Sequence, residues 1–203
     1  MTVLGTPYRL GTTSYIWPAD ILANVRHLGP LVDDVELVLF EVDGHSNLPD
    51  AAARAELKAL AQLHDLTYTV HLPADLALAH PVSLDKARRV IDATRNLSPW
   101  AYVVHLDGRA IEADPEPGTL HRWRDDALRV LEKIAGMAGG AERLCMENLE
   151  NYSPEHFFPL LDCLPVGLCV DVGHLWLAGR DPMAVLADHL ARTRVIHLHG
   201  VAT

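Results

Sequence analysis

The sequence predicts an α/β protein of the TIM (β/α)8-barrel type, on three observations. Short β-branched segments alternate with longer amphipathic segments, as in repeated strand–helix units around a parallel sheet. The predicted strands begin roughly 25 to 40 residues apart, which leaves room for one helix and two short loops per repeat. Nearly every predicted strand ends in His, Glu or Asp. A barrel gathers such side chains at one mouth, whereas an open sheet binds its ligand beside one or two strands.

Seven strands are predicted from short apolar, β-branched runs. They cover residues 8–14, 35–41, 67–73, 102–106, 143–148, 167–172 and 194–199. Helical patterns connect them at residues 18–28, 49–64, 83–97, 119–138, 154–164 and 182–193. Gly29 and Pro30 end the first helix, Ser83 is a favourable N-cap, and Gly139 follows the fourth helix. Pro182 stands in the first turn, where proline is tolerated.

Composition limits the classes of function. The chain has 203 residues, 49% hydrophobic and 22% charged, which is the balance of an ordered globular protein. We expect a single TIM-barrel domain over residues 1–203. Lys and Arg number 17 against 27 Asp and Glu, so the formal charge is −10. That charge disfavours nucleic acid as a partner.

The expected location is the cytoplasm. Three cysteines without a C-x-x-C pair fit a reducing compartment. The first residues, MTVLGTPYRL, lack the basic segment and apolar core of a signal peptide. No apolar run approaches the ~20 residues of a membrane span, so no membrane partner is expected.

Polar residues interrupt the apolar strand runs near their ends. Barrel strands are buried on both faces, so a polar residue there needs a buried partner or a ligand. His174 follows one strand end and would lean over the mouth, and His199 shares a strand face with the histidine two residues before it. The strand-end residues are Glu41, His71, His105, Glu147, Asp171 and His197.

A bound metal would satisfy these groups together. Imidazole and carboxylate ligands without thiolate suit Zn, Mn, Fe or Co, and the absence of a cysteine ligand favours a catalytic site over a structural zinc site. We therefore predict a divalent-metal cofactor, with zinc as the expected ion. Cys145 and Cys169 lie one layer deeper, where packing is the expected role.

The motifs VHLP, VHL, MEN, DVGH and IHLHG, in that order, resemble the apurinic endonuclease type 2 branch of the xylose isomerase-like barrels. The resemblance implies one to three metal ions, with Glu147 bridging two of them. By the same resemblance, His71 and His105 serve the first metal. The full implied ligand set is His71, His105, Glu147, Asp171, His174 and His197.

Longer segments, among them TSYIWPADILANV, LTYTVHLPADL and DVGHLWLAGRD, resemble the cobamide-remodelling hydrolases of this superfamily. That resemblance implies a small-molecule phosphoester substrate, the nucleotide loop of a cobamide, cleaved by a metal-activated water. A metal lowers the pKa of its bound water to about 7 and stabilises charge on the leaving oxygen. Glu147 is the predicted bridging catalytic residue, and Glu41 is the predicted outer-sphere acceptor or base.

Further residues are candidates for orienting substrate or ligands. They are Asn148, Glu150 and His199. Tyr15 and Trp17, after the first strand, could stack on a flat ligand, although packing is the commoner role of such aromatics. Arg109, Arg122 and Arg180 could meet phosphate, although surface solvation is commoner.

The family resembled continues through an eighth strand that ends in Glu, whereas this sequence stops at Thr203. A barrel without its last strand has two unpaired edges. We therefore expect a chain truncated after the seventh strand. The alternative is a naturally short protein that a partner chain completes.

Three other functions remain open. A sugar isomerase or epimerase of the same barrel uses one divalent metal, for which Glu147, Asp171 and His197 fit equally well. An abasic-site DNA endonuclease needs a basic groove, which the net charge disfavours. A metal-free module could instead bind a small ligand by hydrogen bonds alone.

Overall fold

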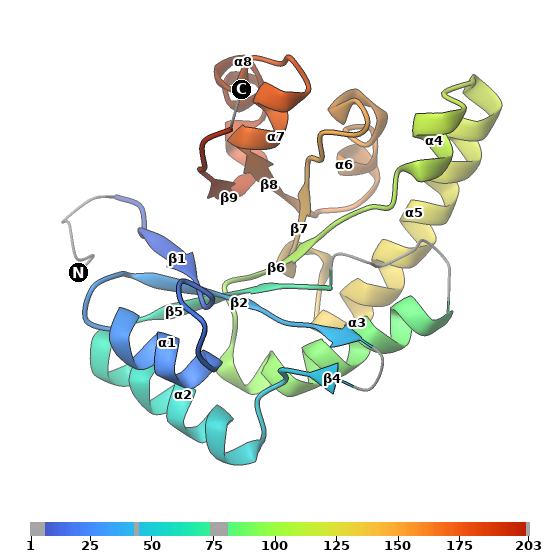
Figure 1. The fold of residues 1–203 in the computed structure, drawn as a ribbon. Helices are drawn as coiled ribbons and strands as arrows, with labels where there is room; N and C mark the ends of the chain where they lie inside the picture. The colour runs from blue at the N-terminus through green and yellow to red at the C-terminus, as the bar shows by residue number, and fades with distance from the viewer. Residues whose placement is uncertain (1–6, 43–44, 74–80, 202–203) are drawn as a thin grey trace. The chain divides into compact units, whose positions relative to one another are not determined.

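A computed structural model gives the structure of residues 7–42, 45–73 and 81–201. The chain divides into two compact units, one of residues 1–73 and 86–102 and one of residues 74–85 and 103–203. Both units alternate strands with helices along the chain (Figure 1). Strand β6 (Ala101–Val104) begins in the first unit and ends in the second, and helix α3 (Pro81–Thr94) also contributes to both.

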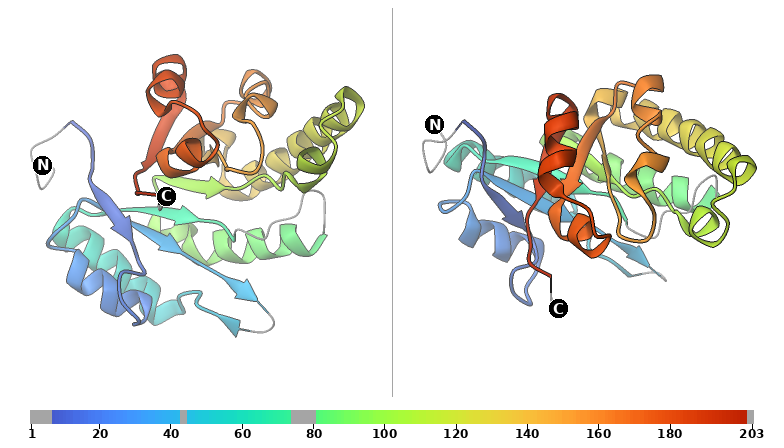
Figure 2. Two further views of the ribbon diagram at one scale, coloured as in Figure 1. Left: turned by 45° about the horizontal axis from the view of Figure 1, so that its top comes forward. Right: turned by 90° about the horizontal axis from the view of Figure 1, so that it is seen from above.

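In the first unit, parallel strands pair in the order β1-β2-β5-β6. The complete elements are β1 (Gly11–Thr13), β2 (Asp34–Val38), β5 (Thr67–His71), α1 (Ile21–Leu28) and α2 (Ala51–His64). The two helices lie side by side on one face of the strands (Figure 2). Asp20 and Asp50 accept backbone N–H groups at the helix starts. These caps explain why the helices begin two to three residues later than predicted.

Strands β2 and β5 have one apolar face and one polar face. On the apolar face, Val35 and Leu37 are fully buried, and the hydroxyl of Tyr68 donates to the Leu57 carbonyl of α2 at 2.7 Å. In register on the opposite face stand Asp34, Glu36, Thr67 and Thr69. Polar residues were predicted only at the strand ends, so this polar face in the middle of the strands was not predicted.

Asp34 makes stability depend on pH. Burial raises the pKa of its carboxyl to about 6, against hydrogen bonds from Thr67 and Thr69 that lower it. In the unfolded chain the carboxyl ionises near its ordinary value of 3.8. The folded chain still binds the proton between these values, so the contribution of Asp34 to stability is greatest below about pH 4 and falls as pH rises to about 6.

We therefore expect Asp34→Asn to raise the free energy of unfolding at neutral pH and to change it little near pH 4. The pKa shift corresponds to about 3 kcal/mol, which we reduce to about 2 kcal/mol because water reaches part of the carboxylate. Urea unfolding at both pH values measures the effect, with the exposed Asp188→Asn as control. Parallel pH profiles of the Asp34 variant and the unmodified chain would contradict the expectation.

The second predicted strand ends earlier than expected, which corrects the placement of Glu41. Strand β2 stops at Val38, and Glu41 lies in β3 (Glu41–Val42), which pairs antiparallel with β4 (His45–Ser46). Its Oε2 lies 3.4 Å from Nη1 of Arg89. Asn47 explains the break, because its side chain bonds both Phe40 N and Val38 O and so turns the chain. Glu41 is therefore not a strand-end residue of the parallel sheet.

In the second unit, the end of β6 and three further parallel strands pair in the order β6-β7-β8-β9. The strands are β7 (Leu144–Glu147), β8 (Gly167–Asp171) and β9 (Thr193–His197). The helices are α4 (Arg109–Ala113), α5 (Pro117–Ala138), α6 (Leu160–Cys163), α7 (Val172–Leu177) and α8 (Pro182–His189). Strands β7 and β8 are buried throughout, with Leu144, Cys145 and Met146 fully buried, whereas β9 is only partly buried.

Several element boundaries differ from the prediction in this unit. The predicted helix 154–164 is a 3-10 turn, Pro154–His156, followed by α6, because Pro159 between them has no N–H for a continuous helix. The predicted helix 182–193 likewise ends as α8 at His189 and continues as a 3-10 turn. Helices α4 and α7 were not predicted. The last strand ends at His197, so His199 lies beyond it.

The predicted fold class is confirmed. Seven parallel strands follow one another in chain order with helices between them, as in a TIM barrel through its seventh strand–helix repeat. All three cysteines are free thiols. Among the helices in the described ranges, none combines the length and the apolar character needed to cross a membrane.

Candidate metal centre

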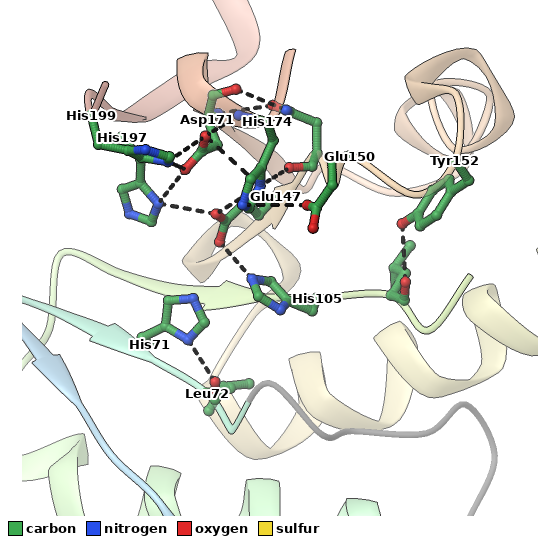
Figure 3. A network of polar contacts seen from close by, with 12 residues as sticks. His71, Leu72, His105, Glu147, Glu150, Tyr152, Asp171, His174, His197 and His199 are labelled. Carbon is green, nitrogen blue, oxygen red and sulfur yellow. Dashed lines mark hydrogen bonds and ion pairs between the residues drawn. The ribbon is translucent and has the colours of Figure 1, made fainter. Parts of the chain in front are cut away.

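The second unit carries a cluster of carboxylates and imidazoles at consecutive strand ends (Figure 3). Glu147, Asp171 and His197 are the last residues of β7, β8 and β9, and His105 directly follows β6. Parallel strands place their carboxyl ends on one edge, so four positions that are far apart in the sequence meet. These four residues were predicted to meet at the strand ends, and the structure brings them together.

Glu147 is the centre of the cluster. It is only 3% exposed. Its Oε2 lies 2.9 Å from Nε2 of His105, and its Oε1 lies 3.1 Å from Nδ1 of His197. Nδ1 of His174 lies 3.8 Å from the same Oε1. One buried carboxylate thus faces three imidazoles.

Asp171 is the second buried carboxylate. Its Oδ1 accepts the backbone N–H of His174 at 2.7 Å, which begins helix α7 directly at the strand end. Its Oδ2 lies 3.7 Å from Nδ1 of His197. Burial opposes ionisation of Asp171, but the hydrogen bonds from His197 and the His174 N–H outweigh it and lower the pKa of the carboxyl. Asp171 is therefore held as a carboxylate.

Asn148 holds the strand that carries Asp171. Its Nδ2 donates to the Asp171 carbonyl at 2.9 Å, and its Oδ1 accepts the Asp171 N–H at 2.8 Å. The residue is buried. Asn148 was predicted to orient ligands or substrate, and in the structure it fixes the main chain of the candidate ligand Asp171.

Three histidines share one tautomer. Nδ1 of His174 lies 2.9 Å from the Asn148 carbonyl, and Nδ1 of His199 lies 3.1 Å from the Gly200 carbonyl. In the first unit, Nδ1 of His71 lies 2.7 Å from the Leu72 carbonyl. A carbonyl can only accept, so each Nδ1 carries a hydrogen, and in the neutral ring Nε2 is the nitrogen with the lone pair. A backbone carbonyl on Nδ1 is a usual partner of metal-binding histidines.

His199 was predicted to contact substrate, and it joins the cluster from beyond β9. Its Nε2 lies 3.0 and 3.1 Å from the two carboxylate oxygens of Asp171. The Gly200 carbonyl and the Asp171 charge raise the pKa of the His199 imidazole above its ordinary value. Its ring meets the His174 ring edge to face, with centroids 5.7 Å apart.

Potential ligand atoms form two groups within the second unit. One atom from each of Glu147, Cys169 and His197 lies within 4.8 Å of the others, and so does one from each of Asp171, His174 and His199. Sequence analysis gave Cys169 no chemical role. The signal that could have found it is strand register, because Cys169 stands opposite Glu147 in the β7–β8 pair.

The remaining candidates have contacts of their own. In the first unit, Tyr15 is 68% exposed and Trp17 packs edge-on against His27 of α1; both lie in the loop after β1, as predicted. In the second unit, Glu150 is exposed, with Oε2 3.4 Å from Nε2 of His174.

The three arginines considered for phosphate binding also have partners. Arg109 makes a bidentate ion pair with Asp107, and Arg180 pairs with Glu155. Arg122 donates to Thr119 at 3.1 Å. These contacts occupy each guanidinium at least in part.

The donor set fits a divalent cation. Two carboxylates, each 3% exposed, repel each other in a buried setting unless a cation or bound protons offset their charge. His174 and His199 stand beside them, each with Nδ1 on a backbone carbonyl and Nε2 toward a carboxylate. Nitrogen and oxygen donors of this kind suit zinc, manganese, iron or cobalt.

Fold and site together define an α/β-barrel protein with a candidate metal centre at the carboxyl ends of its strands. The chain belongs to the xylose isomerase-like TIM-barrel family, whose model matches residues 22–203. No curated protein matches the sequence.

Solved structures with the same fold are distant in sequence. A D-tagatose 3-epimerase-like protein has a TM-score of 0.72 and 16% identity, covering 95% of this chain and 76% of that one. The probable 3-DHS dehydratase AsbF of Bacillus anthracis has a TM-score of 0.75 and 13% identity, covering 97% and 74%. The 3-keto-D-glucoside 4-epimerase YcjR of E. coli has a TM-score of 0.63 and 20% identity, covering 92% and 77%. At these identities the likeness shows the fold alone.

Proposed function

We propose that this chain is a divalent-metal enzyme of the sugar isomerase or epimerase class, acting on a small hydroxy-carbonyl substrate. The observation that carries the proposal is the meeting of Glu147, Asp171 and His197 at three successive strand ends, with His197 Nδ1 at 3.1 Å from one carboxylate and 3.7 Å from the other. Epimerases among the solved structures of this fold support the same class. This choice replaces cobamide phosphoester hydrolysis, the main expectation from sequence, which no comparison supports.

Glu147, Asp171 and His197 would hold the ion. When bound, the ion polarises the carbonyl and hydroxyl oxygens of the substrate and so acidifies the neighbouring C–H. Oε2 of Glu147 would accept that proton, the C–H electron pair forms the C=C bond of an enediolate while the carbonyl π pair moves onto its oxygen, and Nε2 of His105, 2.9 Å away, shares the proton with the carboxylate. Return of that proton to the same face regenerates the substrate. A proton delivered from solvent to the opposite face gives the epimer, and the proton held by Glu147 is then released to solvent.

Solvent isotope exchange tests this proposal over many sugars at once, because it reports loss of the acidified C–H proton whichever sugar is bound. The zinc- or manganese-loaded chain is incubated in D2O with a panel of ketoses and 3-keto sugars, and NMR follows deuterium entry beside the carbonyl. We expect exchange with at least one sugar, a fall of about 100-fold or more with a chelator, and recovery when metal is restored. Metal-loaded protein that exchanges no member of the panel would overturn the proposal.

Phosphoester hydrolysis is the second candidate, and the observation that favours it is the number of histidines. His105, His174 and His199 join the three strand-end residues in the cluster, more imidazoles than a single-metal isomerase needs. Chelator-sensitive cleavage of bis(p-nitrophenyl) phosphate, in the absence of isotope exchange, would favour this function.

A small-molecule substrate fits both candidates, since the net charge of −10 disfavours nucleic acid. We also propose a cytoplasmic location, in keeping with the three free thiols.

A further inference from the structure

The main chain that follows His105 accepts hydrogen bonds from buried aromatic side chains of the second unit. We infer that Tyr152 is a positioning residue, which holds the chain after β6 so that the His105 imidazole faces the Glu147 carboxylate. The inference rests on the proposed function in one respect, because that function gives His105 a share of the proton that Glu147 accepts. The geometry of the contact is independent of the reaction.

The first argument is the hydrogen bond that follows the strand end. Strand β6 ends at Val104, so His105 and Leu106 lie beyond it. The hydroxyl of Tyr152 donates to the Leu106 carbonyl at 3.0 Å (Figure 3), and the two residues are 6% and 1% exposed. Losing this donor would leave the carbonyl in a place that water does not reach, so the bond fixes the main chain there. Burial and nearby carboxylates raise the pKa of the hydroxyl above its ordinary value, so it stays protonated as a donor.

The second argument is that another aromatic side chain holds the next carbonyl. Nε1 of Trp123, on α5, donates to the Asp107 carbonyl at 2.7 Å. The rings of Trp123 and Tyr152 meet edge to face with centroids 5.6 Å apart, and Phe157 meets the Tyr152 ring at 6.5 Å. Such edge-to-face contacts fix the orientation of a ring. Two aromatic donors from different elements therefore hold two successive carbonyls after His105.

The third argument is the fit of the Tyr152 ring against Gly108. A Cβ added at Gly108 would lie 2.0 Å from Cδ1 and 2.4 Å from Cε1 of Tyr152. Gly108 has a φ of −99°, so its backbone does not require glycine. The chain therefore leaves space for the Tyr152 ring directly before α4.

The loop after β7 thus holds the chain on both sides of Glu147. Asn148 binds the main chain at the end of β8, and Tyr152 binds the main chain after β6. Nε2 of His105 lies 2.9 Å from Oε2 of Glu147, so a shift of about 1 Å in the chain that carries His105 would break this hydrogen bond.

Histidine side-chain NMR of the full, metal-free chain tests the inference without reference to any reaction. Tyr152→Phe removes the hydroxyl and keeps the ring. We expect the ring nitrogen signals of His105, identified by their loss in His105→Gln, to move at least half of the way towards those of a histidine in a model peptide at the same pH, because the bond to Glu147 is lost. Gly108→Ala keeps the hydroxyl but displaces the ring, and it should move the same signals.

Isotope exchange measures the consequence for the proposed function. In zinc-loaded Tyr152→Phe, exchange at saturating sugar should fall about 10-fold. Its zinc content should be unchanged, because the three proposed ligands keep their places. Tyr68→Phe is the matched control, because the Tyr68 hydroxyl also donates to a buried carbonyl, that of Leu57 in the first unit, at 2.7 Å. It should lower stability and change neither the His105 signals nor the exchange rate.

The outcomes distinguish this inference from the proposed function. His105 signals that stay in place in Tyr152→Phe and Gly108→Ala would overturn the inference, whatever happens to exchange. Equal changes in Tyr68→Phe would also overturn it, because they would assign the effect to a general loss of stability. If Tyr152→Phe does not fold, Gly108→Ala decides the NMR test alone. His105 signals that move as expected, with no isotope exchange on any sugar in the unmodified chain, would uphold the inference and refute the isomerase function.

Discussion

Replacing Glu147 by glutamine is expected to weaken metal binding strongly and to abolish activity. The carboxylate faces His105 at 2.9 Å and His197 at 3.1 Å and is 3% exposed, so glutamine keeps the volume while removing the charge that an ion needs. We expect zinc affinity to fall about 100-fold or more, and isotope exchange to fall to background. Titration calorimetry with Zn2+ measures the first effect.

The same variant is expected to be at least as stable as the unmodified chain when a chelator is present. The charge of Glu147 works against the overall lowering of the Asp171 pKa, because two buried negative charges repel each other in the metal-free protein. Zinc should raise the melting temperature of the unmodified chain more than that of Glu147→Gln at the same concentration. Glu132→Gln, exposed on α5, is the control and should respond to zinc normally. A Glu147→Gln chain that binds zinc at the original affinity would refute the assignment of Glu147 as a ligand.

Four of the candidate site residues could be predicted from the sequence because they interrupt the apolar pattern of predicted strands. His105, Glu147, Asp171 and His197 interrupt apolar runs, and a polar residue in a buried strand has few explanations other than a partner or a ligand. Parallel strands then force their carboxyl ends together, so local sequence was enough to predict a shared site.

The features that could not be predicted depend on side-chain contacts in three dimensions, which the spacing of residues along the sequence does not show. Glu41 continues an apolar run in the sequence, yet the Asn47 side chain turns the chain before it. Gly173 looks like an ordinary small residue until His199 is seen to lie against it. Sequence analysis proposed Asn148 for orienting ligands, but its role in holding β8 is visible only once two neighbouring strands are in register.

Asn148→Ala is expected to lower both stability and metal affinity. The side chain exchanges hydrogen bonds of 2.9 and 2.8 Å with the carbonyl and N–H of Asp171. Alanine leaves both buried main-chain groups without these bonds, which costs about 2 to 4 kcal/mol in the free energy of unfolding. Asp171 would then be held less firmly at the end of β8, and we expect zinc affinity to fall about 10-fold. Urea unfolding and zinc titration measure the two effects separately.

Two further variants separate the positioning role of Asn148 from a general loss of stability. Asn148→Asp keeps an acceptor for the Asp171 N–H but removes the donor and adds a third carboxylate beside Glu147 and Asp171, so without metal it should be less stable at neutral pH than at about pH 5. Bound zinc should reduce this difference, because a cation offsets the added charge. Asn96→Ala, exposed in the turn after α3, should change neither measurement. If Asn148→Ala lowers stability but binds zinc as tightly as the unmodified chain, then Asn148 supports the fold and has no part in positioning Asp171 for the metal.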